Sequence, residues 1–384
     1  MPSSVDAYWL ALRRVAGLGP RTAKLLLEKF GPAERIFAVS QSEIESAGVG
    51  SRVANALAQF RNFEPLDREL CELPHLGARL VRWTDEDYPP NLRQIADPPP
   101  YLFVRGSTPL IERRMVAVVG ARAASDAGKR MAERIGLELA AKGFTVVSGL
   151  ARGIDGCAHQ GALDADGRTI AVLGCGIDVV YPPEHRKLAD SIIEKNGALM
   201  TELPLGMEPM GENFPARNRI LSGLCLGVVI VEAAEKSGSL ITARMALEQN
   251  RQVFAVPGSP LTGKTRGSNR LIRDGAILVE CVDDIIDELK PQLADPAVAP
   301  TPPNPAETPA PSRIVQRQAV AEPVEESITE ANAIMMQLKT SQKLHVDAII
   351  EACGLDARIV LRLLLELELK GLVAQHPGKL FSLA

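Results

Sequence analysis

Arginines follow glycine-rich turns at two places where a helix is expected to begin. Gly120 and Arg122 come directly after the apolar run Met115–Val119, and Ser125 stands where the next helix would start. Such a turn offers backbone N–H groups, a hydroxyl cap and a guanidinium to an anion. The second turn repeats this composition in Ser148, Gly149, Arg152 and Gly153. Both turns therefore predict contacts to phosphate.

Aromatic residues and further cations follow in later turns. Gly174 and Gly176 lead to Tyr181 and then to Lys187. A later segment contains Phe214, Arg217, Asn218 and Arg219, and another small-residue turn contains Ser237, Gly238 and Ser239. Unpaired bases stack on aromatic rings while cations follow the phosphate backbone. The combination predicts a groove for single-stranded nucleic acid.

Asp155 and His159 are four residues apart and would share one face of a helix. The pair could serve as a general acid and base. Because the sequence places no nucleophile beside it, we favour a capping Asp and a hydrogen-bonded His. No catalytic residue is assigned.

A nucleotide-binding or nucleotide-hydrolysing protein is the main alternative. Gly258–Thr265 matches the phosphate-binding loop pattern GxxxxGK[ST] and follows an expected strand. Pro260 removes one backbone donor, and Arg266-Gly267-Ser268 is expected to delay the next helix to about Ser268. Ser237–Ser239 could instead hold a phosphate of a small nucleotide in an enzyme or sensor. We favour nucleic-acid binding without hydrolysis.

The elements that position these turns are short apolar runs separated by helix-length segments. Continuous apolarity indicates strands covered on both faces, hence a mostly parallel α/β sheet. Ligands of such sheets bind beyond the carboxyl ends of the strands, where the turns above would lie. Strands are expected at 115–119, 144–148, 169–173, 198–201, 228–231, 252–256 and 276–279.

Four regions are expected along the 384 residues. Residues 1–70 repeat a pattern, since Gly17–Ala23 matches Gly48–Ala54, which resembles paired helix-hairpin-helix units of a helical SAM-like domain. Residues 71–290 form the sheet domain, and 291–325 are a Pro/Ala-rich linker. Residues 326–384 resemble a winged helix with a helix at 356–370 and a hairpin at 376–379. The near balance of acidic and basic residues there favours protein contact over groove reading.

Composition excludes several classes of protein. Hydrophobic residues make up 46% and charged residues 23%, as in a soluble globular protein. The first residues resemble no leader and no run is long enough to span a membrane, so we expect a cytoplasmic protein. The six cysteines form no CxxC pair, so neither metal nor disulfides are expected. The net charge is −4, yet residues 101–275 contain 22 Lys and Arg against 18 Asp and Glu.

The ordered segments VAVVGARAAS, SGLARGID, AHQGAL, TIAVLGCGIDVVYP, FPARNRILSGL, VVIVEAAEKSGSLITARMALE, VFAVPG and GSNRLIRDGA resemble the signature of the DprA/Smf family over roughly residues 70–285. The resemblance implies a Rossmann-like homodimer that binds single-stranded DNA, protects it and loads the recombinase RecA on it during natural transformation. It also implies no cofactor. Arg122 stands at the arginine of the family's GSR motif, Lys187 in the basic segment after YP, and Phe214, Arg217 and Arg219 in FPxRNR.

Overall fold

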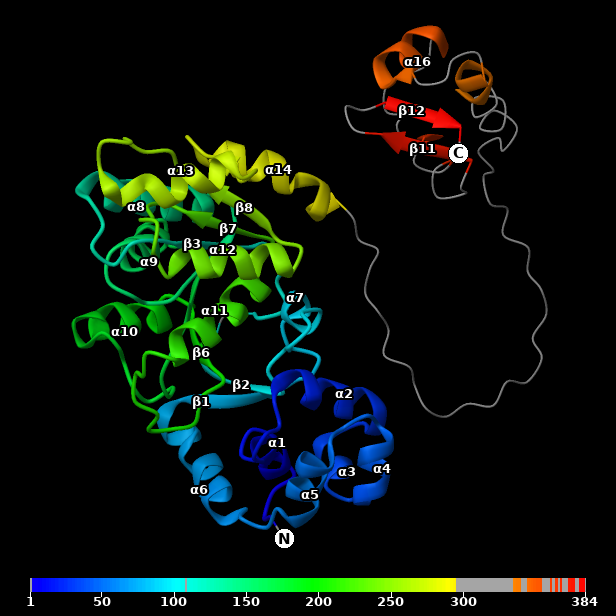
Figure 1. Ribbon diagram of the computed structural model, residues 1–384. Helices are drawn as coiled ribbons and strands as arrows, with labels where there is room; N and C mark the ends of the chain where they lie inside the picture. The colour runs from blue at the N-terminus through cyan, green and yellow to red at the C-terminus, as the bar shows by residue number, and fades with distance from the viewer. Residues whose placement is uncertain are drawn as a thin grey trace, which may run out of the picture. The chain divides into compact units, whose positions relative to one another are not determined.

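The computed structural model describes residues 2–107, 109–294, 334–339, 344–353, 360, 363–364, 367, 372–376 and 380–383. Contacts divide the chain into two compact units, Met1–Ala299 and Pro300–Ala384. Figure 1 shows the helices and strands of each unit.

The first unit contains one mixed sheet whose described strands follow the order β1-β2-β6-β5-β4-β3-β7-β8-β9. Neighbours from β6 to β9 in this order are parallel, whereas β1 pairs antiparallel with β2, and β2 antiparallel with β6. The strands are β1 Ala78–Arg82, β2 Tyr101–Gly106, β3 Met115–Val119, β4 Thr145–Ser148, β5 Thr169–Val172, β6 Ala198–Thr201, β7 Gly227–Ile230, β8 Gln252–Ala255 and β9 Ile277–Leu278.

All seven expected strands are present, so the predicted parallel α/β core is confirmed. The two antiparallel strands, β1 and β2, were not predicted. Beyond β3 the order reverses direction, because β4, β5 and β6 lie on one side of it and β7, β8 and β9 on the other. This reversal is the switch point at which doubly wound sheets open a crevice.

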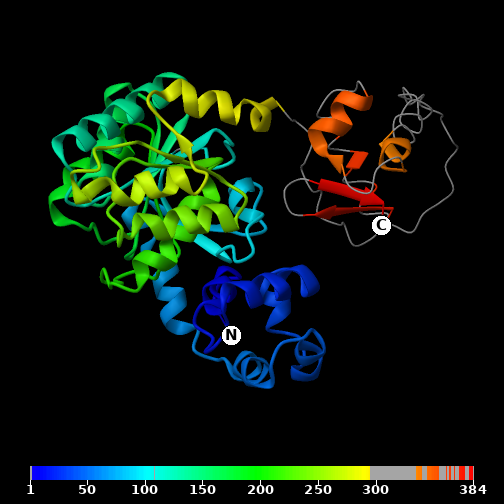
Figure 2. The same ribbon diagram turned by 45° about the horizontal axis from the view of Figure 1, so that its top comes forward.

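Helices cover both faces of the sheet (Figures 1 and 2). Val116 and Val118 of β3 pack with α8 and α9, whereas Ala117 and Val119 pack with α11 and α12, as alternation along a strand requires. The helices of this part are α7 Pro90–Arg93, α8 Asp126–Ala141, α9 Ile154–Asp164, η2 Pro183–His185, α10 Arg186–Glu194, α11 Asn213–Leu224, α12 Ser239–Glu248, η3 Gly263–Thr265, α13 Arg266–Arg273 and α14 Val282–Ala294.

The N-terminal part of the same unit is helical. The two repeated motifs are in equivalent positions, because Gly19 precedes the first residue of α2 and Gly50 the first residue of α5. Gly17 and Gly48 have φ of +81° and +89°, values that favour glycine. The elements are α1 Asp6–Leu12, α2 Pro20–Phe30, α3 Ala33–Ile36, α4 Gln41–Ser46, α5 Ser51–Gln59, α6 Glu64–Glu72 and η1 Pro74–Leu76.

The second unit contains a small antiparallel sheet in the order β10-β12-β11 around a core that includes Ile349 and Phe381. Its described elements are β10 Leu344–His345, α16 Val346–Cys353, β11 Val373–His376 and β12 Leu380–Leu383. The expected helix at 356–370 and turn at 376–379 fall mostly outside the described residues. So does the expected linker, except that α14 continues through its first four residues to Ala294. No helix in the described ranges has the length and apolarity that a membrane crossing requires.

Candidate nucleic-acid interface

An aromatic–arginine cluster lies beyond the carboxyl ends of β3, β4 and β5. The guanidinium carbon of Arg122 lies 5.0 Å from the centre of the Phe214 ring, and that of Arg217 lies 6.0 Å from it. The Tyr181 ring centre is 5.8 Å from that of Phe214. Arg122, Tyr181 and Phe214 border a small depression together with Arg152. The depression presents two exposed cations and two partly exposed rings, the chemistry that an unpaired strand requires.

Gly153 allows the two arginine-bearing turns to meet. Its φ is +76°, and a Cβ at this position would lie 2.3 Å from the carbonyl oxygen of Ala121. Only glycine combines this backbone conformation with so close an approach. Gly174 has a related role, since a Cβ there would lie 2.9 Å from the Phe214 ring. These two glycines therefore shape the cluster through packing.

Arg217 lies beneath the cluster, buried from solvent. It donates to the carbonyl oxygens of Gly149, at 3.0 Å, and Val172. Burial lowers the pKa of its guanidinium to about 10, against the opposing attraction of Asp155. A Cβ at Gly149 would lie 2.5 Å from an Arg217 nitrogen. In this structure the side chain supports the loops from below, and the predicted contact of Arg217 with DNA stays a prediction.

Arg219 is also withdrawn from the surface. Its guanidinium contacts both carboxylate oxygens of Glu202, at 2.7 and 2.5 Å, and donates to the carbonyl of Asp97 at 2.8 Å. Arg13, which follows α1, reaches the same carboxylate at 2.7 Å. Through Glu202, Arg219 thus anchors α11, which carries Phe214, to the N-terminal helices. Its predicted contact with DNA stays a prediction.

The helix start predicted to bind an anion already holds one of the chain's own carboxylates. Glu232 is buried, and it accepts from the Ser125 N–H at 3.1 Å and from the Ser125 hydroxyl at 2.5 Å. Its backbone oxygen accepts from Ala121 at 2.7 Å. At Gly120, a Cβ would lie 2.6 Å from Ile154. Gly120 and Ser125 therefore have packing and capping roles in this structure, and their predicted phosphate contacts stay predictions.

Asp155 fills the second turn in the same manner. Its carboxylate accepts from the backbone N–H groups of Gly149, at 3.1 Å, and Ala151, at 3.4 Å. Burial raises the pKa of this carboxyl group, while Arg217 acts in the opposite direction. Asp155 is the second residue of α9, whose N-cap is Gly153, so the expected helix cap is wrong. Its carboxylate instead holds the preceding turn together.

His159 is fully buried, and its Nδ1 lies 2.7 Å from the hydroxyl of Thr169. That hydroxyl donates to Val146 O, so Nδ1 carries the proton and donates to Thr169. Nε2 is buried without a partner among the described residues. Burial lowers the pKa of His159 to about 3. Sequence reasoning expected a hydrogen bond within the turn, whereas the bond reaches a neighbouring strand.

The remaining predicted residues fall into two groups. Lys187 and Gly238 are exposed, and Arg152 is exposed beside Glu184, with which it forms an ion pair. The others have partners within the protein. Ser148 donates to Val118 O, Asn218 accepts from Arg217, and the hydroxyl groups of Ser237 and Ser239 form a hydrogen bond with each other. Gly176 is closely packed, since a Cβ there would contact Pro204 O.

The phosphate-loop-like segment has its polar groups engaged internally. Lys264 donates to the carbonyl of Ala123 at 3.1 Å, and the Thr265 hydroxyl donates to Ser259 O at 2.7 Å. The N–H of Gly258 donates to Asn269 at 3.0 Å. The helix begins at Arg266, two residues earlier than expected. Gly267 is accommodated because it is buried and donates to Ala233 O.

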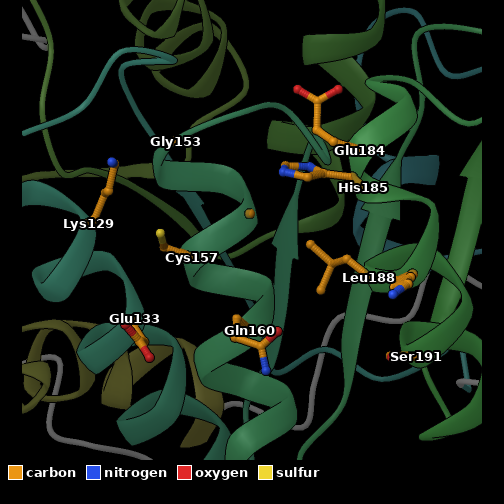
Figure 3. A pocket seen from close by; sticks show the side chains of 11 residues that line it. Lys129, Glu133, Gly153, Cys157, Gln160, Glu184, His185, Leu188 and Ser191 are labelled. Atoms are coloured by element: carbon orange, nitrogen blue, oxygen red, sulfur yellow. The ribbon is translucent and has the colours of Figure 1, made fainter. Parts of the chain in front are cut away.

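A second hollow lies between α8, α9 and α10, with a volume of about 440 Å³. Figure 3 shows Cys157 and Gln160 of α9 on its floor, Lys129 on one wall, and His185 and Leu188 on the other. Of its lining residues, only Gly153 and Lys187 were predicted as site residues. The motifs give no sign that the remaining lining residues share a hollow, so only the packing of the three helices reveals this cavity.

The fold and site define a Rossmann-like α/β protein with an exposed aromatic–arginine cluster at its strand ends. Residues 79–290 match the sequence profile described as DNA recombination-mediator protein A, and residues 298–379 match the DprA winged helix domain. The chain belongs to the DprA/Smf family. The profile for residues 298–379 also supports the predicted winged helix.

Among similar proteins, protein Smf of Escherichia coli K12 is 39% identical over 335 residues, which cover 87% of this chain and 85% of that protein. The X-ray structure of DNA processing protein A from Streptococcus pneumoniae has a TM-score of 0.64 at 35% identity and covers 75% of this chain and 99% of that one. The protein from Helicobacter pylori, whose structure concerns its single-stranded DNA binding mode, has a TM-score of 0.51 at 30% identity and covers 57% and 98%.

Proposed function

We propose that this protein binds single-stranded DNA, protects it, and loads RecA on it during natural transformation. The observation that carries the proposal is a contrast at the strand ends between polar groups that bond within the protein and side chains that are exposed to solvent. In the first two turns Glu232 accepts from the Ser125 N–H and Asp155 from the Gly149 N–H, while Arg122 and Arg152 are exposed and the Phe214 ring is partly exposed. A surface of cations and rings fits a strand whose bases are unpaired.

The same contrast argues against the nucleotide-binding alternative. A Rossmann-type nucleotide site needs free N–H groups at the first helix start, and here Glu232 accepts from Ser125 at that position. Lys264, the cation of the phosphate-loop-like segment, is directed to a backbone carbonyl. We therefore propose a protein that binds DNA without catalysing a reaction on it. We further propose that it acts in the cytoplasm, where RecA acts, and that it forms a homodimer through the sheet domain.

The test is fluorescence-anisotropy binding of labelled oligo-dT and of the matching duplex, over a salt series, with wild type and Arg122→Ala. Wild type should prefer the single strand. The variant should lose about tenfold in affinity, the effect of one charge-assisted hydrogen bond of about 1.5 kcal/mol. Its log–log salt slope should fall in magnitude by about 0.7, since one phosphate contact is removed. Equal binding of duplex, or an unchanged variant, would contradict the assignment of the site.

Recombinase loading is tested separately by the lag before RecA filaments form on long single strands. The protein should shorten the lag, and Arg122→Ala should not. The homodimer is tested by light scattering of the full chain. A wild-type protein that binds DNA yet leaves the lag unchanged would retain the binding function and exclude the loading function.

A further inference from the structure

The cavity between α8, α9 and α10 adjoins the aromatic–arginine cluster. The depression at the cluster includes Arg152, whereas the cavity includes Gly153 and Glu184. The ion pair between Arg152 and Glu184 therefore stands where the two hollows meet. The side chains of this pair are 54% and 49% exposed, so neither is locked in place by packing.

The cavity lining combines two ammonium groups, an imidazole ring and an apolar side chain with two carboxylates, Glu133 and Glu184. Lys129 and Lys187 contribute ammonium groups from α8 and α10 and are exposed, so both can reach a phosphate. The His185 ring and Leu188 form a flat and an apolar surface above the floor at Cys157 (Figure 3). Its volume of about 440 Å³ falls in the range of small-molecule sites, about 300 to 1,000 Å³.

Gly156 of α9 allows the His185 ring to pack closely against this helix. A Cβ at this position would lie 2.8 Å from the His185 ring, so the imidazole rests directly on α9. The Nδ1 atom of His185 lies 2.9 Å from the carbonyl oxygen of Leu150, which fixes the ring plane. A ring held in one orientation beside an open volume is a preformed stacking surface.

Resting on the proposed function, we infer that the cavity is a second nucleotide subsite for the same DNA strand, and that Arg152 passes from Glu184 to a phosphate as the strand enters. The strand leaves the Phe214 ring, crosses at Arg152 and places its next base against His185, with Lys129 and Lys187 contacting phosphate. Glu184 acts as an internal competitor of the backbone phosphate. An exposed ion pair of this kind is worth about 0.2–1 kcal/mol, so a phosphate can displace it.

Cys157 provides a direct measurement, because its thiol lies on the cavity floor and is free. Burial raises its pKa, so labelling with N-ethylmaleimide is carried out at pH 8.5 on the full chain. Mass spectrometry of peptides follows Cys157, with exposed Cys71 as the internal control. Saturating dT20 should slow the labelling of Cys157 at least fivefold and leave Cys71 unchanged. The trinucleotide dT3, which is bound at the Phe214 ring alone, should slow the labelling of Cys157 much less.

A blocking variant separates direct contact from a distant effect. Ser191→Trp fills the cavity from the partly exposed face of α10 and should reduce the affinity for dT20 about fivefold or more, while leaving that for dT3 within twofold. Glu184→Gln should raise the affinity for dT20 about two- to fivefold, because the competitor is neutralised. Thermal unfolding of both variants checks that they are folded.

Saturated dT20 binding without protection of Cys157 would overturn the second subsite and leave the proposed function standing. The same holds if Cys157 is protected but Ser191→Trp binds dT20 normally, since the protection would then arise at a distance. Equal protection by free dTMP would make the cavity a mononucleotide site and also overturn the inference. Loss of all single-strand binding by the wild type would instead reject the proposed function.

Discussion

The arginines of this protein divide into an exposed pair and a buried pair that sequence motifs do not distinguish. Arg122 and Arg152 lie in glycine-containing turns and reach solvent, whereas Arg217 and Arg219, on α11, are 6% and 7% exposed. The buried guanidinium groups bond to backbone carbonyls and to Glu202, and they hold the Phe214 helix in place. The segment that contains Phe214, Arg217 and Arg219 therefore supplies both a ring of the proposed binding surface and the support beneath it.

The largest expected effect concerns the buried pair and protein stability. Arg219→Ala leaves Glu202 buried with Arg13 as its remaining cation, so the free energy of unfolding should fall by about 3 kcal/mol. Urea denaturation measures this loss. The matched control is Arg122→Ala, whose unfolding free energy should stay within about 0.5 kcal/mol of wild type. If Arg219→Ala were as stable as wild type while losing DNA affinity, Arg219 would belong to the binding surface and the comparison would fail.

The next effect concerns the exposed surface and DNA affinity. Phe214→Ala removes a ring on which a base can stack, a change of about 1–3 kcal/mol in binding free energy, or roughly 5- to 150-fold in Kd. Anisotropy with oligo-dT measures the change, and the salt slope should stay that of wild type because no charge is removed. Phe214→Tyr is the conservative control and should retain most of the affinity. A Phe214→Ala variant with wild-type Kd would remove stacking from the site.

A third effect concerns the buried region alone, because the buried His159 makes the free energy of unfolding depend on pH. Its folded pKa of about 3 lies below the ordinary value of 6.5. Between these values the unfolded chain binds a proton that the folded chain excludes, so stability rises with pH there. The contribution is fully present above pH 6.5 and is lost at about 1.4 kcal/mol per pH unit as the pH falls towards 3.

Urea denaturation at pH 6.0 and 5.0 tests this dependence, with His159→Gln as the comparison. The free energy of unfolding of the variant should rise less steeply with pH, by about 1.4 kcal/mol per pH unit, because glutamine does not titrate. Identical slopes in the two proteins would show that His159 accepts a proton in the folded state and that its surroundings are less closed than the hydrogen bond to Thr169 indicates.

The sequence predicts the sheet well and the site only in part. Fully apolar runs such as Met115–Val119 admit one interpretation, since a strand covered on both faces needs apolar residues on both. The site depends on where each polar side chain finds its partner. Glu232 accepts from Ser125, 107 residues earlier in the chain, and Glu202, just after β6, pairs with Arg219. Local motifs therefore carry no sign of either contact. The cavity above α9 depends on three helices and is equally hidden from the sequence.

The smallest expected effect concerns Lys264, an exposed cation of the phosphate-loop-like segment that belongs to neither pair of arginines. Lys264→Ala removes one hydrogen bond to Ala123 O, which adjoins Arg122 in the same turn. DNA affinity should therefore change by less than about twofold, and the free energy of unfolding by less than about 0.5 kcal/mol. ATP with magnesium should not raise the Tm of wild type or variant, since a ligand stabilises only a folded state that binds it. A rise in Tm with ATP that Lys264→Ala abolishes would restore the nucleotide hypothesis, because it would mean that the lysine exchanges Ala123 O for a phosphate.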